Sequence, residues 1–501
     1  MGTTIAPIRS RTRALSRLDP TAWSVVGLTV LAAFLRFRTL GSQSFWLDES
    51  FTVGDAHASV GDLLHRLRHL ETNPPLYFAL EWVWVRVFGY SEVAVRATSA
   101  IAGVATVPVV YAATRTLVGR LAGVAAAALV AISPVLIYYS QEARPYALLV
   151  FLCTASLLFF ARMLLLPAKR DAIGWVVASG CALCTHYFAA FMVIPMAAWL
   201  VLRSPARRMV LIAVGAVGAV GLALVPLIVL QLRESGGWVG KVPLGLRLAQ
   251  AGRIFATGSY LPTRGLVPLV LAAALAALML VLWRADPRTR TGSVTVLALA
   301  IASFLIPLAA AAVGADYLLD RYLLPIWVSL VIVVAAAVEV PRVARAGLIP
   351  ALVLAGVFIG PAIARPPNVK HDDWRGMARV LGPAQPGRVV IVAPLPGLEI
   401  DPIRLYMTDL QPLDHSRSAT KVAVIRYVAF SPSSRPVKAP RVPRAFRLVS
   451  SRPVQRWLVT QFRATQPRVV DPRRLITPFT TTGRYGTQVF VERPAKAPGS
   501  R

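Results

Sequence analysis

The chain has 501 residues, of which 56% are hydrophobic and only 15% are charged, and its formal net charge is +31. A soluble domain of this length cannot cover so much apolar surface, so the composition excludes a soluble globular protein and indicates a polytopic membrane protein. In a soluble chain such a charge would suggest a nucleic-acid partner, but the sequence contains no nucleic-acid module and much of the basic charge flanks apolar runs. Anionic lipid and membrane topology therefore explain the charge better.

The N-terminal tail, residues 1–20, holds several arginines and no acidic residue before Asp19. By the positive-inside rule this tail stays in the cytoplasm. An apolar run from Ala22 to about Thr39 follows and is the first predicted span. It delivers the next residues to the outer face of the membrane, which we take to be a bacterial plasma membrane.

A pair of adjacent carboxylates, Asp48 and Glu49, comes directly after this first span. Charged side chains are costly in or near hydrocarbon, so acids placed against the end of a spanning helix are candidates for a functional site. The alternative is a solvated loop that happens to begin with acidic residues. The later motifs favour the functional interpretation.

The first outer loop, residues 41–92, contains a second apolar segment, from Pro74 to Phe88. This segment has about 15 residues and includes Glu81 and Arg86, whereas a span needs roughly 20 residues. We therefore expect an interfacial helix on the outer surface, with its tryptophans at headgroup level. If the segment does not cross, the basic clusters after five later spans all face the cytoplasm, as the positive-inside rule requires.

Eleven spans are predicted in a transmembrane domain of residues 21–363. Two of them, on either side of His186, are short, and a broken or re-entrant pair is the alternative there. The odd number of spans places residues 364–501 outside the cytoplasm, where short apolar runs such as Val389–Val392 predict an α/β domain, while the Pro-rich stretch 431–456 predicts a loop. The predicted spans lie near residues 22–39, 95–114, 119–137, 145–166, 172–186, 189–202, 208–230, 265–283, 294–314, 322–340 and 346–363.

Five polar clusters fall at the outer ends of these spans in this topology. Acidic, Arg, His and Tyr side chains at one depth indicate a polar cavity at the membrane surface. The clusters are Asp48–Glu49, Glu71–Asn73, Tyr138–Tyr146, Thr185–Tyr187 and Asp316–Tyr322.

The order of these motifs resembles a known family. The acidic pair after the first span, the Pro-Pro-Leu-Tyr at 74–77, the RATSAIAGV that begins at Arg96 and the SQEARPYAL that begins at Ser140 look like those of the GT-C-fold transferases. The nearest group is the family-39-like bacterial branch, related to protein O-mannosyltransferases and the lipid A aminoarabinose transferase. The likeness is good from roughly Trp23 to Tyr187 and holds only in outline over the later spans.

The resemblance implies a GT-C-like fold, a polyprenyl-phosphate-linked sugar as donor, and an extracytoplasmic acceptor that is a glycan, a lipid or a protein. It also implies that Asp48 is the base that takes the proton from the acceptor hydroxyl. Glu142 and Arg144 match the second polar motif of the family. Asn73 stands where many relatives have His or Lys before the Pro-Pro, so this chain departs from the family's pattern there and leaves a phosphate or metal contact at that position open.

The chemistry leads to similar roles without the resemblance. Displacing a phosphate from an anomeric carbon needs a base for the incoming hydroxyl and cations for the leaving group. We assign Asp48 as the base and Glu49 as its electrostatic or acceptor-orienting neighbour, and Arg144 and Arg321 as phosphate ligands. Direct attack, with no carboxylate as nucleophile, predicts inversion. The other candidates for donor or substrate binding are Glu142, Tyr146, His186, Tyr187, Tyr322 and Asn73.

Several of these residues have simpler alternatives. Glu142 and Arg144 stand near a predicted helix start and could serve as a cap. His186 on an apolar face could be a satisfied core histidine. Arg321 could form a surface ion pair with Asp320.

A divalent metal ion is also an alternative, because Asp48, Glu142 and His186 together offer two oxygens and one nitrogen. We assign no metal, since many relatives work without one. For the whole chain, the main alternative function is a transporter or flippase for a lipid-linked sugar, and a third is a non-catalytic scaffold of the cell envelope. Transporters place polar groups at the midplane of repeated halves, whereas here the polar groups crowd one face and no internal repeat is visible.

Overall fold

The computed structural model describes residues 20–234, 242–257, 266–314, 316, 318–340, 344–363, 372–382, 389–393, 401–408, 410–412, 420–430, 445–454, 457–470 and 488–492. The chain forms two compact units, each of which is described by itself. The first comprises Met1–Leu40 and Asp55–Arg365, and the second comprises Gly41–Gly54 and Pro366–Arg501. The predicted cytoplasmic tail, apart from Pro20, lies outside the described residues.

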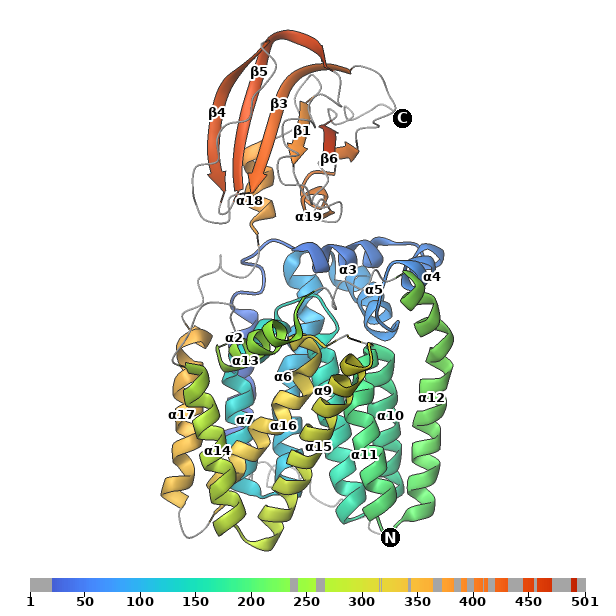
Figure 1. Ribbon diagram of the computed structural model, residues 1–501, viewed down its shortest axis with the longest axis vertical. Helices are drawn as coiled ribbons and strands as arrows, with labels where there is room; N and C mark the ends of the chain where they lie inside the picture. The colour runs from blue at the N-terminus through green and yellow to red at the C-terminus, as the bar shows by residue number, and fades with distance from the viewer. Residues whose placement is uncertain are drawn as a thin grey trace, which may run out of the picture. The chain divides into compact units, whose positions relative to one another are not determined.

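Helices occupy all eleven ranges that were predicted as spans (Figure 1). By length and composition, seven of the described helices are able to cross a membrane, or eight if the bent pair at 120–140 counts as one span. The polytopic membrane class is therefore confirmed, while the number of eleven crossings stays a prediction. The helices are α2 Pro20–Phe37, α6 Glu92–Leu117, α7 Arg120–Ile132, α9 Tyr146–Leu165, α10 Lys169–Thr185, α11 Ala190–Arg203, α12 Arg207–Glu234, α14 Leu266–Arg284, α15 Pro287–Ala312, α16 Leu324–Ala336 and α17 Ala344–Ile363.

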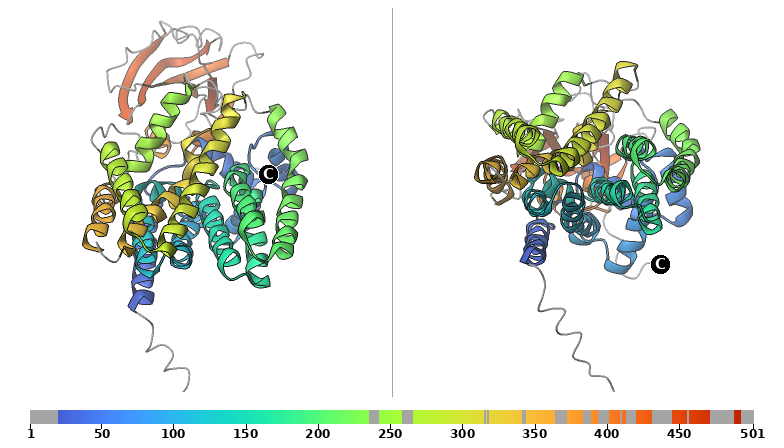
Figure 2. Two further views of the ribbon diagram at one scale, coloured as in Figure 1. Left: turned by 60° about the horizontal axis from the view of Figure 1, so that its bottom comes forward. Right: turned by 90° about the horizontal axis from the view of Figure 1, so that it is seen from below.

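The core of the first unit lies between long apolar helices. Helix α6 packs against α7 and α9, and α9 packs in turn against α10. Their facing side chains, such as Val107, Leu149 and Leu157, are almost fully buried. Helix α2, at the blue end of the colour scale, lies at the edge of the bundle (Figure 2), and only 22% of its apolar window is buried. An apolar helix that stays this exposed within its own unit has a surface suited to lipid.

The span predicted at 119–137 is bent by 57° between α7 and α8, which runs from Pro134 to Ser140. Proline has no N–H and cannot continue the hydrogen-bond ladder of α7. The fully buried Arg36 of α2 donates to the carbonyl oxygens of Ala131, at 3.0 Å, and Val130, at 3.2 Å, near the end of α7. A guanidinium from a neighbouring helix thus satisfies backbone groups that the bend releases, as an apolar surrounding requires.

Three short helices follow the first span: α3 Leu47–His57, α4 Val60–His69 and α5 Leu76–Phe88. Helix α5 has 13 residues and is shorter than the described helices that could cross a membrane by length and composition. The indole N–H groups of Trp82 and Trp84 donate to the backbone oxygens of Ala58 and Ala94, both at 2.9 Å. These tryptophans therefore attach α5 to neighbouring segments of the chain by hydrogen bonds. The interfacial position of the helix stays a prediction.

The second unit contains a six-stranded sheet in the order β2-β6-β1-β3-β5-β4, in which β1 and β3 are parallel and the other pairs antiparallel. The helices α18 and α19 pack with it around a core that includes Trp374, Met377 and Val424. The elements are α18 Trp374–Leu381, β1 Val389–Ala393, α19 Asp401–Arg404, β2 Leu410–Pro412, β3 Thr420–Phe430, β4 Phe446–Val454, β5 Trp457–Val470 and β6 Gln488–Glu492.

Two features of this unit differ from the sequence-based expectation. Strand β4 lies inside the stretch 431–456, which was expected to be a loop, because β5 supplies the hydrogen-bonding partner that its composition did not reveal. The segment after the first span also belongs here. Ser44 donates through Oγ to the backbone oxygen of Asp372 at 2.9 Å, and the N–H of Phe45 donates to the hydroxyl of Tyr406 at 2.7 Å. An extracytoplasmic position of this unit stays a prediction.

Candidate functional site

Arg144 occupies the loop between α8 and α9 in the first unit and is buried. Its backbone N–H donates to the oxygen of Glu142 at 2.8 Å, and its own backbone oxygen accepts from Ser99 Oγ of α6 at 3.1 Å. The N-cap position of α9 is Pro145, with no side-chain cap hydrogen bond. The side chains of Glu142 and Arg144 are thus not used to cap α9, which removes the simpler explanation for this motif.

The guanidinium of Arg144 lies within a buried network of acids and arginines. Its Nη1 is 3.8 Å from Glu71 Oε1. Next to them, Arg66 of α4 forms an ion pair with Asp55 of α3. Burial raises the pKa of the Asp55 carboxyl, and the contact with Arg66 opposes that shift. The charge of Arg144 also acts on Asp55, so these four side chains form one electrostatic system.

Asp55 and Arg66 were not among the sequence-based candidates. A signal for Asp55 was present, because it follows Asp48 by seven residues, and such a spacing places two side chains on one face of a helix. Arg66 gave no such signal, since it lies on a helix with several other basic residues.

A further buried acid, Glu81, lies on α5. Its Oε2 accepts from Thr98 Oγ1 of α6 at 2.7 Å, while no described residue hydrogen-bonds its Oε1. Burial raises the pKa of Glu81 to about 8. The neighbouring Tyr77 hydroxyl is 3.5 Å from Ser99 Oγ, the group that contacts the Arg144 backbone. The sequence showed Glu81 only as a residue that argued against a membrane span.

Arg321 and Tyr322 lie in the short helix η4 Asp320–Leu323, at the start of α16. The guanidinium carbon of Arg321 is 5.7 Å from the ring centroid of Tyr146, which begins α9. Asp320 accepts from the hydroxyl of Tyr139 at 3.2 Å, and the charges of both Arg321 and Glu142 act on it. Arg321 therefore lies beside Tyr146, and its interaction with Asp320 belongs to the same arrangement.

His186, at the end of α10, lies near the same residues. It is buried, with an exposed fraction of 1%. Its ring centroid is 4.9 Å from that of Tyr322 and 6.0 Å from that of Tyr146. The charges of Arg144 and Arg321 both act on it. The structure thus brings together five predicted residues, Arg144, Tyr146, His186, Arg321 and Tyr322, which we call the arginine–histidine cluster.

Two other predicted residues meet at Gln231 of α12. The hydroxyl of Tyr187 donates to Gln231 Oε1 at 2.8 Å, and the Gln231 amide donates to the backbone oxygens of Asn73, at 3.1 Å, and Leu67, at 2.7 Å. One buried amide of α12 therefore contacts Tyr187, which follows α10, Leu67 of α4 and Asn73 in the loop before α5. Substrate contacts of Tyr187 and Asn73 stay predictions, and Gln231 had no distinguishing signal in its apolar helix.

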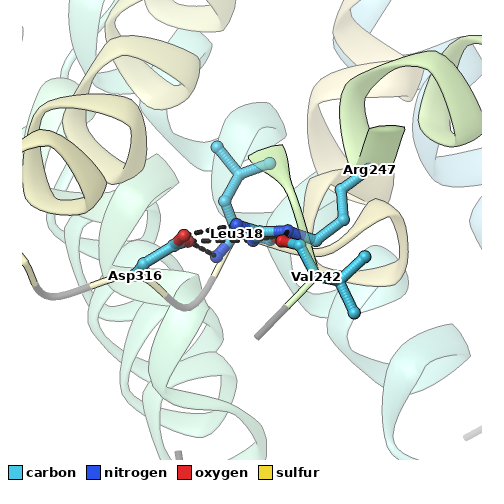
Figure 3. A network of polar contacts seen from close by, with 4 residues as sticks. All are labelled: Val242, Arg247, Asp316 and Leu318. Atoms are coloured by element: carbon cyan, nitrogen blue, oxygen red, sulfur yellow. Dashed lines mark hydrogen bonds and ion pairs between the residues drawn. The ribbon is translucent and has the colours of Figure 1, made fainter. Parts of the chain in front are cut away.

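The segment before Arg321 is held by Arg247 of α13, Leu244–Thr257 (Figure 3). Its guanidinium donates through Nη1 and Nη2 to both carboxyl oxygens of Asp316 and through Nη1 to the backbone oxygen of Leu318, and its Nε donates to Val242 at 2.9 Å. The hydrogen bond from Arg247 holds the pKa of Asp316 below its usual value. The bidentate contact with Asp316 and the bond to Leu318 fix the chain four and two residues before η4.

Asp48 and Glu49 lie in the first turn of α3, in the part of that helix that belongs to the second unit. Asp48 is partly exposed, whereas Glu49 is buried and accepts from the backbone N–H of Trp46 at 3.3 Å. Their predicted roles beside the arginine–histidine cluster stay predictions.

Among the residues that the structure describes, no group of three or more His, Cys, Asp or Glu side chains is arranged to hold a metal ion. The metal alternative based on Asp48, Glu142 and His186 stays a prediction, because metal dependence has to be measured on the reaction itself.

The comparisons with known proteins agree with this architecture. Residues 72–230 match the family model for dolichyl-phosphate-mannose-protein mannosyltransferase. The fold is similar to that of ArnT from Cupriavidus metallidurans, solved with undecaprenyl phosphate bound, with a TM-score of 0.54 and 15% identity over 88% of this chain and 98% of that one. No curated protein matches the sequence.

Two looser likenesses have TM-scores below 0.5. The Archaeoglobus fulgidus oligosaccharyltransferase in its apo form has a TM-score of 0.46 and 14% identity over 73% of this chain and 58% of that one. The Saccharomyces cerevisiae Pmt1–Pmt2 complex bound to its sugar donor has a TM-score of 0.34 and 19% identity over 46% of this chain and 36% of that one. The likeness to ArnT shows that the chain has the GT-C fold, as the resemblance implied, and residues 72–230 match the model of a mannosyltransferase family.

Proposed function

We propose that this chain transfers a sugar from a polyprenyl-phosphate donor to a hydroxyl group of an extracytoplasmic acceptor, with inversion at the anomeric carbon. The observation that carries the proposal is the arrangement around Tyr146, where the guanidinium carbon of Arg321 lies 5.7 Å from the ring centroid and the charges of Arg144 and Arg321 both act on the buried His186. One buried and one partly buried guanidinium group together match the charge and shape of a phosphate. The undecaprenyl phosphate bound to the similarly folded ArnT supports this ligand class.

The proposed step balances as a single displacement. Asp48 takes the proton of the acceptor hydroxyl, and the acceptor oxygen forms a bond to the anomeric carbon. The bond from that carbon to the phosphate oxygen breaks, and its electron pair leaves with the polyprenyl phosphate. Arg144 and Arg321 stabilise the charge that develops there. The role of Asp48, and that of Glu49 in orienting the acceptor, rest on the order of motifs in the sequence.

The aromatic residues of the cluster give the donor a suitable surface. Tyr146 and Tyr322 flank His186, and Phe188 stacks on Tyr322 with ring centroids 4.2 Å apart and an angle of 15°. Aromatic faces exclude water and so strengthen the electrostatic contacts of the arginines. We propose that Tyr146 and Tyr322 contact the donor and that Glu142, whose charge acts on Asp320, helps to hold this surface in place.

The proposed topology has the N-terminus in the cytoplasm of a bacterium and the second unit on the outer side of its plasma membrane. A reporter enzyme that is active only in the cytoplasm should then be inactive when fused after Arg501. Activity of that fusion would contradict the topology.

The function is tested with the purified full-length chain and radiolabelled polyprenyl-phosphate sugars. We expect the wild-type chain to release the sugar or transfer it to cell-envelope acceptors, and the Asp48→Asn variant to be much slower. The reaction should continue in EDTA, since we assign no metal. Movement of intact labelled lipid across proteoliposomes, without cleavage of the sugar, would identify a flippase and contradict the proposal.

A further inference from the structure

The backbone at the end of α10 selects one tautomer of His186. Its Nδ1 accepts a hydrogen bond from the backbone N–H of Phe188 at 3.2 Å, which caps the short helix η2 Tyr187–Ala189. A neutral imidazole has one donor nitrogen and one acceptor nitrogen. A ring that accepts through Nδ1 therefore carries its proton on Nε2.

This Nε2–H is buried, and no described residue hydrogen-bonds it. The rings of Tyr322, Phe188 and Tyr146 surround the imidazole, with centroids at 4.9, 5.3 and 6.0 Å. A second proton on the ring would add a positive charge beside Arg144 and Arg321 in a buried place. The imidazole is therefore held as a neutral donor.

We infer that His186 donates its Nε2–H to an oxygen of the phosphate that Arg144 and Arg321 bind. This inference rests on the proposed function and assigns the third donor of its phosphate site. Buried polar groups in proteins are nearly always hydrogen-bonded, so a buried N–H without an acceptor among the described residues needs one from water or from a bound ligand. Since the charges of Arg144 and Arg321 both act on His186, the ligand acceptor that fits this environment is an anionic oxygen.

The same tautomer excludes two other roles. A nitrogen that holds a proton has no lone pair to offer to a metal ion. For the same reason, Nε2 cannot take a proton from the acceptor hydroxyl. His186 thus binds the leaving group and leaves the base to a carboxylate.

Two substitutions separate the nitrogen atoms of the ring. In His186→Asn the amide oxygen replaces Nδ1 and can still accept from Phe188, but the donor at the Nε2 position is lost. In His186→Gln the amide nitrogen reaches the Nε2 position and can donate. The probe is undecaprenyl phosphate, bound to the full-length chain in nanodiscs, and undecaprenol is the lipid without a phosphate.

We expect the dissociation constant for undecaprenyl phosphate to rise about 10- to 100-fold in His186→Asn, as for the loss of a hydrogen bond to a charged group. His186→Gln should recover part of the affinity, and Cys184→Ala, two residues earlier on α10, should bind as the wild type does. Binding of undecaprenol should be equal in all variants. Unfolding temperatures verify that each variant is folded. If His186→Asn does not fold, the affinity of His186→Gln for undecaprenyl phosphate is compared with that of His186→Leu, which has no donor, and tighter binding by His186→Gln supports the inference.

Wild-type affinity in His186→Asn would overturn the role of His186 and leave the proposed function standing. Equal binding of undecaprenyl phosphate and undecaprenol by the wild-type chain would instead contradict the proposed function. Zn²⁺-dependent binding that His186→Asn abolishes would also overturn the inference, because it would show that Nε2 is a metal ligand.

Discussion

Arg36 donates a hydrogen bond from its Nη2 to the carbonyl oxygen of Val130, at 3.2 Å. In an unbroken α-helix this oxygen would accept from the N–H four residues later, but that residue is Pro134, which has no N–H. The arginine of one helix thus supplies the donor that a proline removes from another. This contact explains how a bent helix and a fully buried guanidinium coexist in an apolar bundle.

Replacing this guanidinium should destabilise the bundle. In Arg36→Met the carbonyls of Val130 and Ala131 lose their donor, and each buried polar group left unsatisfied costs about 1–3 kcal/mol. We expect a lower unfolding temperature in detergent. Thr29→Val is the control, because that hydroxyl bonds only to the backbone of its own helix at Val25.

If Arg36 replaces the donor that Pro134 removes, the effects of substituting these two residues should be coupled. Pro134→Ala restores an N–H that can serve Val130, so Arg36→Met should cost less in that background than in the wild type. Equal costs in both backgrounds would show that Arg36 does not act through the bend.

The phosphate contact of Arg144 is tested by the binding of undecaprenyl phosphate and by turnover. Arg144→Ala should weaken both, and Arg144→Lys should restore them only in part, because a point charge replaces a bidentate fork. The control is Arg170→Ala, whose side chain is 88% exposed. Full activity in both Arg144 variants would assign this residue a purely structural role with Glu71.

The carboxylate pair is tested by two neutral substitutions. Asp48→Asn keeps the size of the side chain but removes the proton acceptor, so transfer should fall by about 10²- to 10⁴-fold while the chain still folds. Glu49→Gln should have a milder effect if Glu49 orients the acceptor. The rates of sugar transfer by both variants are to be measured together. If Glu49→Gln abolishes transfer and Asp48→Asn does not, the two roles are reversed.

Glu81 should make stability depend on pH. Burial raises its pKa to about 8, above the value of about 4.3 for an unfolded chain. The folded state therefore retains a proton between these values, and the contribution of Glu81 to stability falls as pH rises from about 4.3 to about 8. Glu81→Gln, which is always neutral, should lose this dependence and be more stable than the wild type at pH 8. Unfolding temperatures of both chains at pH 5 and pH 8 give the comparison, and parallel pH profiles would refute this role for Glu81.

Much of the helical unit was predictable because an apolar run of sufficient length has few alternatives to a helix in a membrane. The proximity of Arg144, His186 and Arg321 was predictable for a related reason. Each stands at the end of an apolar run that was predicted to span, so the predicted topology places all three at the same depth in the membrane. Phosphate binding by these residues stays a prediction, since a sequence gives depth but not the distances between helices.

The contacts that the sequence did not reveal join residues far apart in the chain. Arg36 and Val130 are separated by 94 positions, and Gln231 and Leu67 by 164. Periodicity reports which face of a helix is apolar, but not which carbonyl across the bundle lacks a donor. The pair Asp55 and Arg66 is only 11 residues apart, but it was missed because the two residues lie on separate short helices whose packing only the fold defines.

The segment that carries Asp48 is anchored by the end of the chain. Ser44 bonds to Asp372, Phe45 to Tyr406, and Arg375 to Ser42, over sequence separations of 328, 361 and 333 residues. A premature stop codon shortly after Arg365 would leave every spanning helix in place but remove all three partners. Late nonsense mutations in this gene should therefore abolish transfer as completely as early ones, although the truncated product still inserts into the membrane.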